Sequence, residues 1–180
     1  MRRLAGLDRL DRSVYEAIAR TRTPLLDRSM RALSRAADHS KLSLIASAAL
    51  ALAAGSDGRR AAGNGLASVA VTATIVNVLI KPLVLRRRPD RAGARVPAAR
   101  MVDMPRSRSF PSGHTAAAFA FATGAGRVLP WTGMPLVALA ALVGYSRVHT
   151  GVHFPVDVIA GAVCGVGLAE ATGLWLDQSR

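Results

Sequence analysis

Two histidines and an aspartate have the residue types and spacing of a site that moves protons and forms a covalent bond. His153 and Asp157 are four residues apart, so in a helix they share one face. A carboxylate there can accept one ring N–H and leave the other ring nitrogen free as a nucleophile. His114, in a separate segment, suits a general acid that protonates the leaving group.

Three cations accompany these groups and indicate what the nucleophile attacks. Lys81, Arg88 and Arg147 would repel one another unless an anion sat between them. A phosphoryl group fits, because arginine offers planar paired donors and lysine a point charge. Ser112 and Gly113 precede an expected helix, whose N-terminal backbone N–H groups form a ready anion site. The residues therefore predict phosphoryl transfer.

Apolar runs separated by basic loops must position these residues. The 180-residue chain is 51% hydrophobic and carries a net charge of +13, yet its arginines gather in a few stretches. This pattern is typical of membrane spans. The expected spans are 42–54, 66–85, 112–129, 136–145 with its flanks, and 156–176, with turns at 56–60 and 130–135. The predicted fold is an all-α integral-membrane bundle of about five spans, in which Gly161, Gly165 and Gly167 allow close helix contact.

The first 40 residues form a separate N-terminal region in this prediction. Residues 7–20 place apolar side chains at helical spacing, so we expect an amphipathic helix that lies either in the membrane interface or on the rest of the protein. A second short helix follows over 25–36, and residues 38–40 are typical of a loop or helix start. Residues 41–180 form the membrane domain.

Alternating span directions bring the chemical residues together. The end of the second span, the start of the third, the end of the fourth and the start of the fifth would share one membrane face. The segments 81–89, 110–114 and 146–157 would then meet. Arg86 and Arg87 fit a membrane-flanking role as well as a role in this site, and we expect His149 at the pocket rim or in a structural role.

The three segments carry the motifs K-x6-R-P, P-S-G-H and S-R-x5-H-x3-D, and with them the chain resembles the type 2 phosphatidic acid phosphatase family. The match covers residues 81–157. The resemblance implies His153 as nucleophile, Asp157 as its partner and His114 as acid. It assigns phosphate binding to five residues: Lys81, Arg88, Arg147, Ser112 and Gly113. It also implies that the enzyme uses no metal and no cofactor.

The expected function is therefore hydrolysis of a terminal lipid phosphate through a phosphohistidine. Phosphatidic acid, phosphatidylglycerol phosphate and polyprenyl pyrophosphate all present such a group. The motif residues recognise the phosphate and do not distinguish between the lipids that carry it. A membrane lipid binder or transporter without turnover is the alternative, and a vanadate-dependent haloperoxidase shares the pocket but is generally a larger soluble protein. A nucleic-acid partner is not expected, since aromatic stacking residues are scarce.

The expected location is a bacterial-type cell membrane. Two arguments about the side of the site oppose each other. With five spans, the N-terminus and the site lie on the same side of the membrane. The arginine-rich N-terminus then favours a cytoplasmic site by the positive-inside rule. The family resemblance favours an extracytoplasmic site, which is our prediction.

Overall fold

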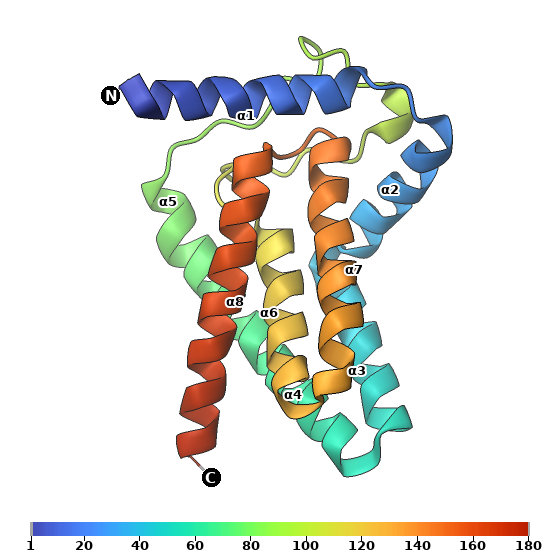
Figure 1. The fold of residues 1–180 in the computed structure, drawn as a ribbon, viewed down its shortest axis with the longest axis vertical. Coiled ribbons are helices and arrows are strands. Elements are labelled where there is room, and N and C mark those ends of the chain that lie inside the picture. The colour runs from blue at the N-terminus through green and yellow to red at the C-terminus, as the bar shows by residue number, and fades with distance from the viewer. Residues whose placement is uncertain (1, 180) are drawn as a thin grey trace.

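A computed structural model describes residues 2–179, with side chains from residue 6 onward, and every regular element in that part of the chain is helical (Figure 1). The all-α prediction is confirmed. The main helices are α1 (Arg2–Arg20), α2 (Pro24–Ala36), α3 (Lys41–Ala53), α4 (Gly55–Thr74), α5 (Lys81–Leu83), α6 (Gly113–Val128), α7 (Pro130–His149) and α8 (Pro155–Gln178). Short 3₁₀ turns span Asp38–Ser40 and Ala98–Arg100.

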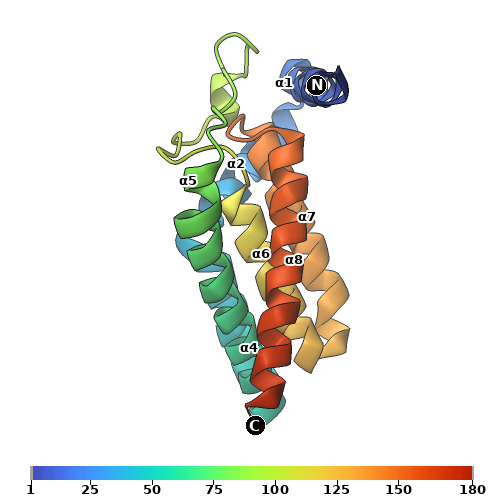
Figure 2. The same ribbon diagram turned by 90° about the vertical axis from the view of Figure 1, so that its left-hand side faces the viewer.

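Helix α6 lies at the centre of the bundle and packs against α4, α7 and α8 (Figures 1 and 2). Glycines on α8 allow this close approach. A Cβ atom at Gly161 or Gly165 would meet the carbonyl oxygens of Ser112 and Ala116 on and before α6. The prediction of close contact is therefore confirmed at these two positions. It is wrong at Gly167, where nothing lies within 4 Å of an added Cβ.

Both predicted turns were placed wrongly. Residues 56–60 belong to α4, and the chain reverses instead at Ala54 and Gly55, where Gly55 has φ of 54°. Residues 130–135 belong to α7, which begins at Pro130 and continues through Pro135. Proline is well tolerated at the first helical position, since its missing N–H would have no partner there. A proline pair thus looks like a turn in the sequence but begins a helix here.

The end of α4 departs from regular α-helix just before the first chemical residue. Residues Ile75–Ile80 form a π-helical stretch that leads directly into α5 at Lys81. Pro82 explains this, because it cannot donate to the carbonyl four residues earlier and its ring crowds that carbonyl. The helix therefore widens over one turn and delivers Lys81 to the end of the bundle.

Two helices among the described residues are long and apolar enough to cross a membrane. They are the continuous helix Gly55–Leu83, of 29 residues, and α8, of 24 residues. The 13 residues of α3 would extend only about 20 Å at 1.5 Å per residue, against a hydrocarbon core of about 30 Å. The predicted helical bundle is thus observed, with two helices that could cross a membrane rather than the five spans expected.

One end of the bundle collects the chemical segments. The end of α5, the start of α6, the end of α7 and the start of α8 all lie there, covered by the loop 84–112 (Figure 1). Helix α1 crosses over this same end, transverse to the bundle. On α1, the side chains of Leu7, Leu10 and Val14 are exposed, whereas that of Asp11 is buried. The N-terminal region therefore packs directly over the candidate site.

Candidate active site

His153 lies in the turn just before α8 and is almost completely buried. Its Nε2 is 3.2 Å from Arg88 Nη1, and its Nδ1 is 3.5 Å from Asp157 Oδ2, a distance longer than a hydrogen bond. Burial lowers the pKa of His153 to about 4; the nearby charge of Arg88 acts in the same direction, and Asp157 opposes both. The imidazole is therefore neutral at physiological pH, as a nucleophile must be.

Asp157 is held in one orientation by three donors. Arg86 Nη1 donates to Oδ1 at 2.6 Å, while the Ser109 hydroxyl and the Phe154 N–H donate to Oδ2 at 2.5 and 3.0 Å. The carboxylate is fully buried and belongs to the first turn of α8. The carboxylate is thereby fixed 3.5 Å from the buried Nδ1 of His153, which has no hydrogen-bond partner among the described residues.

Arg86 is a site residue whose role the sequence left open. One arm of its guanidinium binds Asp157, and the other arm binds Asp11 of α1. Asp11 also accepts the Val156 N–H at 2.9 Å, at the start of α8. Helix α1 is thereby connected to the carboxylate that faces His153. Asp11 gives no local signal in the sequence, because the contact joins residues 75 positions apart.

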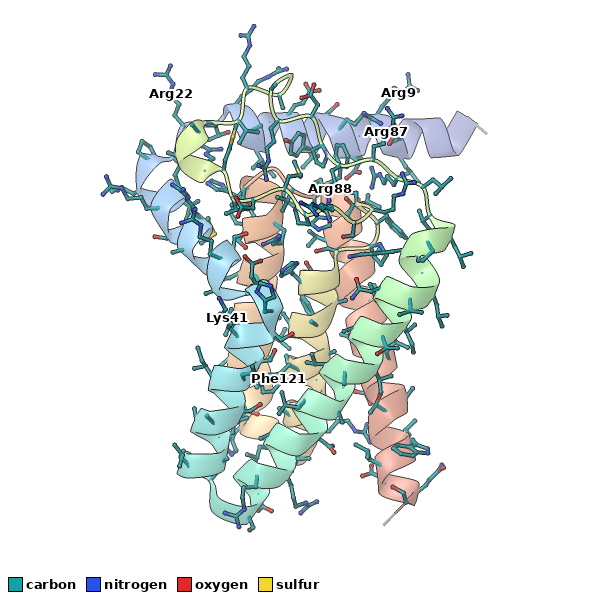
Figure 3. The ribbon with its side chains drawn as sticks, turned by 180° about the vertical axis from the view of Figure 1, so that it is seen from behind. Arg9, Arg22, Lys41, Arg87, Arg88 and Phe121 are labelled. Atoms are coloured by element: carbon teal, nitrogen blue, oxygen red, sulfur yellow. The ribbon has the colours of Figure 1, made fainter. Side chains whose placement is uncertain are left out.

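Lys81 and Arg88 converge on Ser107, which lies outside the three motif segments. The Ser107 hydroxyl is 3.4 Å from Lys81 Nζ and 3.2 Å from Arg88 Nη2. Arg88 also donates to the carbonyl oxygens of Ser107 and Val152. In Figure 3, Arg88 points into the end of the bundle beneath α1, whereas Arg9 and Arg22 point away from it.

Lys81 and Arg88, together with Ser107, form a cationic cradle. Its two cations are available to bind an anion. Within the described residues, neither Lys81 nor Arg88 has a carboxylate at ion-pair distance. Burial, and then the positive charge of Arg147, lower the pKa of Arg88 to about 10. Crowded, half-buried positive charges of this kind are stabilised when an anion binds between them.

The start of α6 forms the opposite wall of the cradle. A Cβ on Gly113 would lie 3.2 Å from Lys81 Nζ, so the absence of a side chain leaves room for the ammonium group. The Ser112 hydroxyl accepts from Thr115 and caps α6. The Ser112 N–H donates to the Asp157 carbonyl at 2.9 Å, so it is not free for an anion as the sequence suggested. Ser112 instead joins the starts of α6 and α8.

His114 and Arg147 share an aspartate from the N-terminal region. Asp38 Oδ1 lies 2.9 Å from His114 Nε2 and 3.5 Å from Arg147 Nη1. Arg147 also donates to the Ser34 hydroxyl and carbonyl, and its Nε has no partner. The charges of Arg147, Lys81 and Arg88 all act on the ring of His114. His114 therefore lies beside the same cradle as His153.

A cavity of about 240 Å³ opens beside Lys81 and His114. Lys81, Ser107, Gly113 and His114 line one side of it. The other lining residues are mostly small: Ala37, His39, Ser40, Ala73, Asn77 and Ala117. The cavity is thus polar where the two motif segments meet and has space next to them for the group that carries the phosphate.

His149 is separate from this chemistry. Its Nε2 is 3.0 Å from Asp27 Oδ1, and the same carboxylate accepts from the fully buried Arg100 at 2.7 Å. This cluster joins α2, α7 and the loop 84–112, which is a structural role. No group of three or more histidine, cysteine, aspartate or glutamate side chains is arranged to hold a metal ion among residues 2–179.

Two solved structures have a similar fold. A phosphatidylglycerolphosphate phosphatase from Bacillus subtilis superposes with a TM-score of 0.72 at 25% identity, covering 97% of this chain and 88% of that one. Aquifex aeolicus LpxE gives a TM-score of 0.69 at 26% identity, over 91% of this chain and 94% of the other.

Curated relatives match over shorter stretches. The decaprenylphosphoryl-5-phosphoribose phosphatase of Mycobacterium tuberculosis is 42% identical over 97 residues, 53% of this chain and 51% of that protein. The undecaprenyl-diphosphatase of Sulfolobus acidocaldarius is 45% identical over 65 residues, 34% of this chain and 30% of that protein. The chain thus spans about half the length of the first of these relatives and less of the second. The model of the PAP2 superfamily matches residues 62–180, well over half of the chain, and the protein belongs to that superfamily.

Proposed function

We propose that the protein hydrolyses the terminal phosphate of a membrane lipid through a phosphohistidine at His153. Nε2 of His153 attacks phosphorus, and the bond from phosphorus to the lipid oxygen breaks as that oxygen takes a proton from His114. His114 then removes a proton from water, which attacks phosphorus and breaks the P–N bond. The electron pair returns to Nε2, and inorganic phosphate leaves.

One observation carries this proposal. The ring of His153 lies between Arg88, at 3.2 Å from Nε2, and the fixed carboxylate of Asp157, at 3.5 Å from Nδ1. Nε2, the ring nitrogen on the Arg88 side, is therefore the one that would attack a phosphoryl group bound by that guanidinium. Lys81, Arg88, Arg147 and Gly113 would hold the phosphoryl oxygens, and their positive charge would stabilise the charge that develops during transfer.

A lipid substrate is supported by the exterior of the bundle. Large apolar side chains are exposed on several helices: Leu52, Leu83, Met134, Ile159, Val163, Leu174 and Trp175. Such a surface is costly in water and suits a bilayer. The relatives act on phosphatidylglycerol phosphate or polyprenyl-type phosphates by their names. The proposed substrate is a lipid with a terminal phosphate, of the phosphatidic acid, phosphatidylglycerol phosphate or polyprenyl pyrophosphate type.

The membrane arrangement belongs to the same proposal. Helices α6 and α7 would add crossings beside the two long helices, and α3, which is too short alone, would complete five crossings only with its polar ends included. Helix α1 would lie on the bilayer surface and the site on the extracytoplasmic side of a bacterial membrane. A cysteine at the exposed Arg22, beside the site, tests the side. We expect a membrane-impermeant thiol reagent to label it in intact cells; protection until lysis would place the site in the cytoplasm.

The function is tested by a screen for phosphate release over these lipid phosphates, with His153→Ala as the blank. We expect turnover of at least one lipid by the native chain and none by the variant. A lipid binder or transporter would bind the same lipids, release no phosphate and keep its affinity in His153→Ala. That outcome would contradict the proposed enzyme and support a lipid binder or transporter.

A further inference from the structure

Asp38 contacts two residues of the site from outside the family motifs. Its Oδ1 reaches His114 Nε2 at 2.9 Å and Arg147 Nη1 at 3.5 Å. It precedes the stretch 62–180 that the superfamily model matches. The side chain is 37% exposed, so it is not a core group buried for packing. The Asp38 carboxylate is therefore placed to act electrostatically on His114 and Arg147.

The backbone around Asp38 adopts an unusual shape to present it. The two residues that follow, His39 and Ser40, have φ of 56° and 57°, the left-handed region that residues other than glycine seldom occupy. They turn the chain between α2 and α3, and both line the cavity with His114. A strained turn of two residues at the cavity edge is the kind of feature that a functional constraint maintains.

We propose that Asp38 is a positioning residue that holds His114 in its acid form and directs the proton toward the leaving group. This inference rests on the proposed function. The Asp38 carboxylate accepts the Nε2–H of His114, so Nδ1 remains as the nitrogen that gives its proton to the lipid oxygen. Asp38 itself exchanges no proton, and His114 recovers its proton from the attacking water.

The charges around His114 show why a carboxylate is needed. Burial of the ring, and then the nearby charges of Arg147, Lys81 and Arg88, all disfavour a positive charge on His114. An acid that must be protonated in such a place needs a compensating negative charge before substrate binds. Asp38 is the carboxylate within ion-pair distance of His114 among the described residues. It also competes with phosphate for Arg147, so it should cost some anion affinity.

The test compares two substrates that differ in their need for an acid. Asp38→Asn should lower kcat/KM for a short-chain alkyl phosphate by about 10- to 100-fold, since general-acid catalysis is worth roughly 10²–10⁴ in rate. For nitrophenyl phosphate, whose leaving group is a weak base, we expect a loss of at most about threefold. kcat/KM depends on the steps up to departure of the leaving group and not on the later hydrolysis of the phosphohistidine. It therefore measures the step in which His114 acts as an acid.

Two further readouts separate positioning from structure. The basic limb of the kcat/KM profile should move to lower pH in Asp38→Asn, because an acid without its carboxylate loses its proton more easily. Vanadate should inhibit this variant at least as tightly as the native enzyme. Asp38→Glu keeps the charge and should recover part of the alkyl phosphate activity. Asp57→Asn, which removes an exposed carboxylate from the distant α3–α4 end, is the control.

Equal losses on both substrates, or an unmoved basic limb, would overturn the proposal and leave Asp38 a structural contact. No loss on either substrate would overturn it as well. These results remain distinct from failure of the proposed function, in which the native enzyme and His153→Ala would be equally inactive on every phosphate ester tried.

Discussion

Arg86 Nη1 donates a 2.6 Å hydrogen bond to Asp157 Oδ1, and the other arm of the same guanidinium binds Asp11 on α1. The carboxylate that faces His153, the proposed nucleophile, is therefore held by the N-terminal helix as well as by its own helix. Asp38 makes a similar connection to His114 and Arg147 from the turn after α2. Asp11 and Asp38, both in the predicted N-terminal region, thus contribute contacts to the site.

Arg86→Ala should lower turnover by about 100-fold, because Asp157 would lose its shortest charged donor and its hold on His153 would loosen. Removing a residue that holds a functional group in place typically costs about 10- to 100-fold in activity at metal sites, and this contact is fully buried on the Asp157 side. The measurement is kcat on the lipid phosphate identified by the screen, with protein amount and folding checked by size-exclusion chromatography in detergent.

Arg87→Ala provides the matched control, since Arg87 is the exposed neighbour of Arg86 with the same charge. It should retain at least about half of the native activity, as surface substitutions usually have small effects. Equal losses in the two variants would show that general positive charge at the membrane flank matters, and not the contact with Asp157.

The pH profile should show a neutral nucleophile well into the acid range. Burial lowers the pKa of His153 from 6.5 to about 4, so the ring stays unprotonated as pH falls from 7 to 5. Activity that depends on this ring is therefore present above about pH 4 and lost below it. The measurement is kcat/KM against pH, corrected for the second ionisation of the phosphate ester near pH 6. A corrected acid limb at 6.5 would contradict the buried site.

The buried pair of Arg100 and Asp27 should matter for stability. Arg100→Ala leaves the Asp27 carboxylate buried without its charged partner, and breaking such a pair costs about 3–5 kcal/mol, equivalent to about 10 °C in Tm for a chain of this size. Thermal unfolding in detergent measures the change. Arg106→Ala, an exposed arginine of the same loop, should leave Tm within about 2 °C; an equal drop there would exclude the buried pair as the cause.

Activity should persist in excess chelator and should be inhibited by vanadate, which mimics five-coordinate phosphorus in the cradle. The physical reason is that Lys81, Arg88 and Arg147 already supply the positive charge that a metal ion would bring to phosphoryl transfer. Hydrolysis is measured before and after chelation. Loss of activity that returns only with an added divalent metal would contradict this expectation.

The sequence was informative wherever a residue acts through its own type and spacing. The spacing of His153 and Asp157 predicted that they lie side by side, and they do, although His153 stands in the turn before α8 and only Asp157 is helical. Alternating helix directions bring Lys81, Arg88 and His114 to the same end of the bundle. The apolar runs also predicted the helices of the bundle. These features depend on local periodicity, which a single sequence contains.

Contacts between distant segments could not be predicted in this way. Asp11 and Asp38 differ from other aspartates of the chain only by the tertiary packing that carries them to Arg86 and His114. The same holds for Ser107, whose hydroxyl joins Lys81 and Arg88 across the loop. Helix boundaries failed for a different reason, because prolines that indicate turns at 130–135 are also compatible with the first turns of α7.

The most direct test of the central claim is to trap the phosphoenzyme. Native protein and the His114→Ala variant, in which hydrolysis of the intermediate should be slow, are mixed with excess lipid phosphate, quenched in base and digested for mass spectrometry. We predict one phosphoryl group on His153, enriched in His114→Ala and absent from His153→Ala. Continued turnover by His153→Ala, with no phosphohistidine in any variant, would contradict the account.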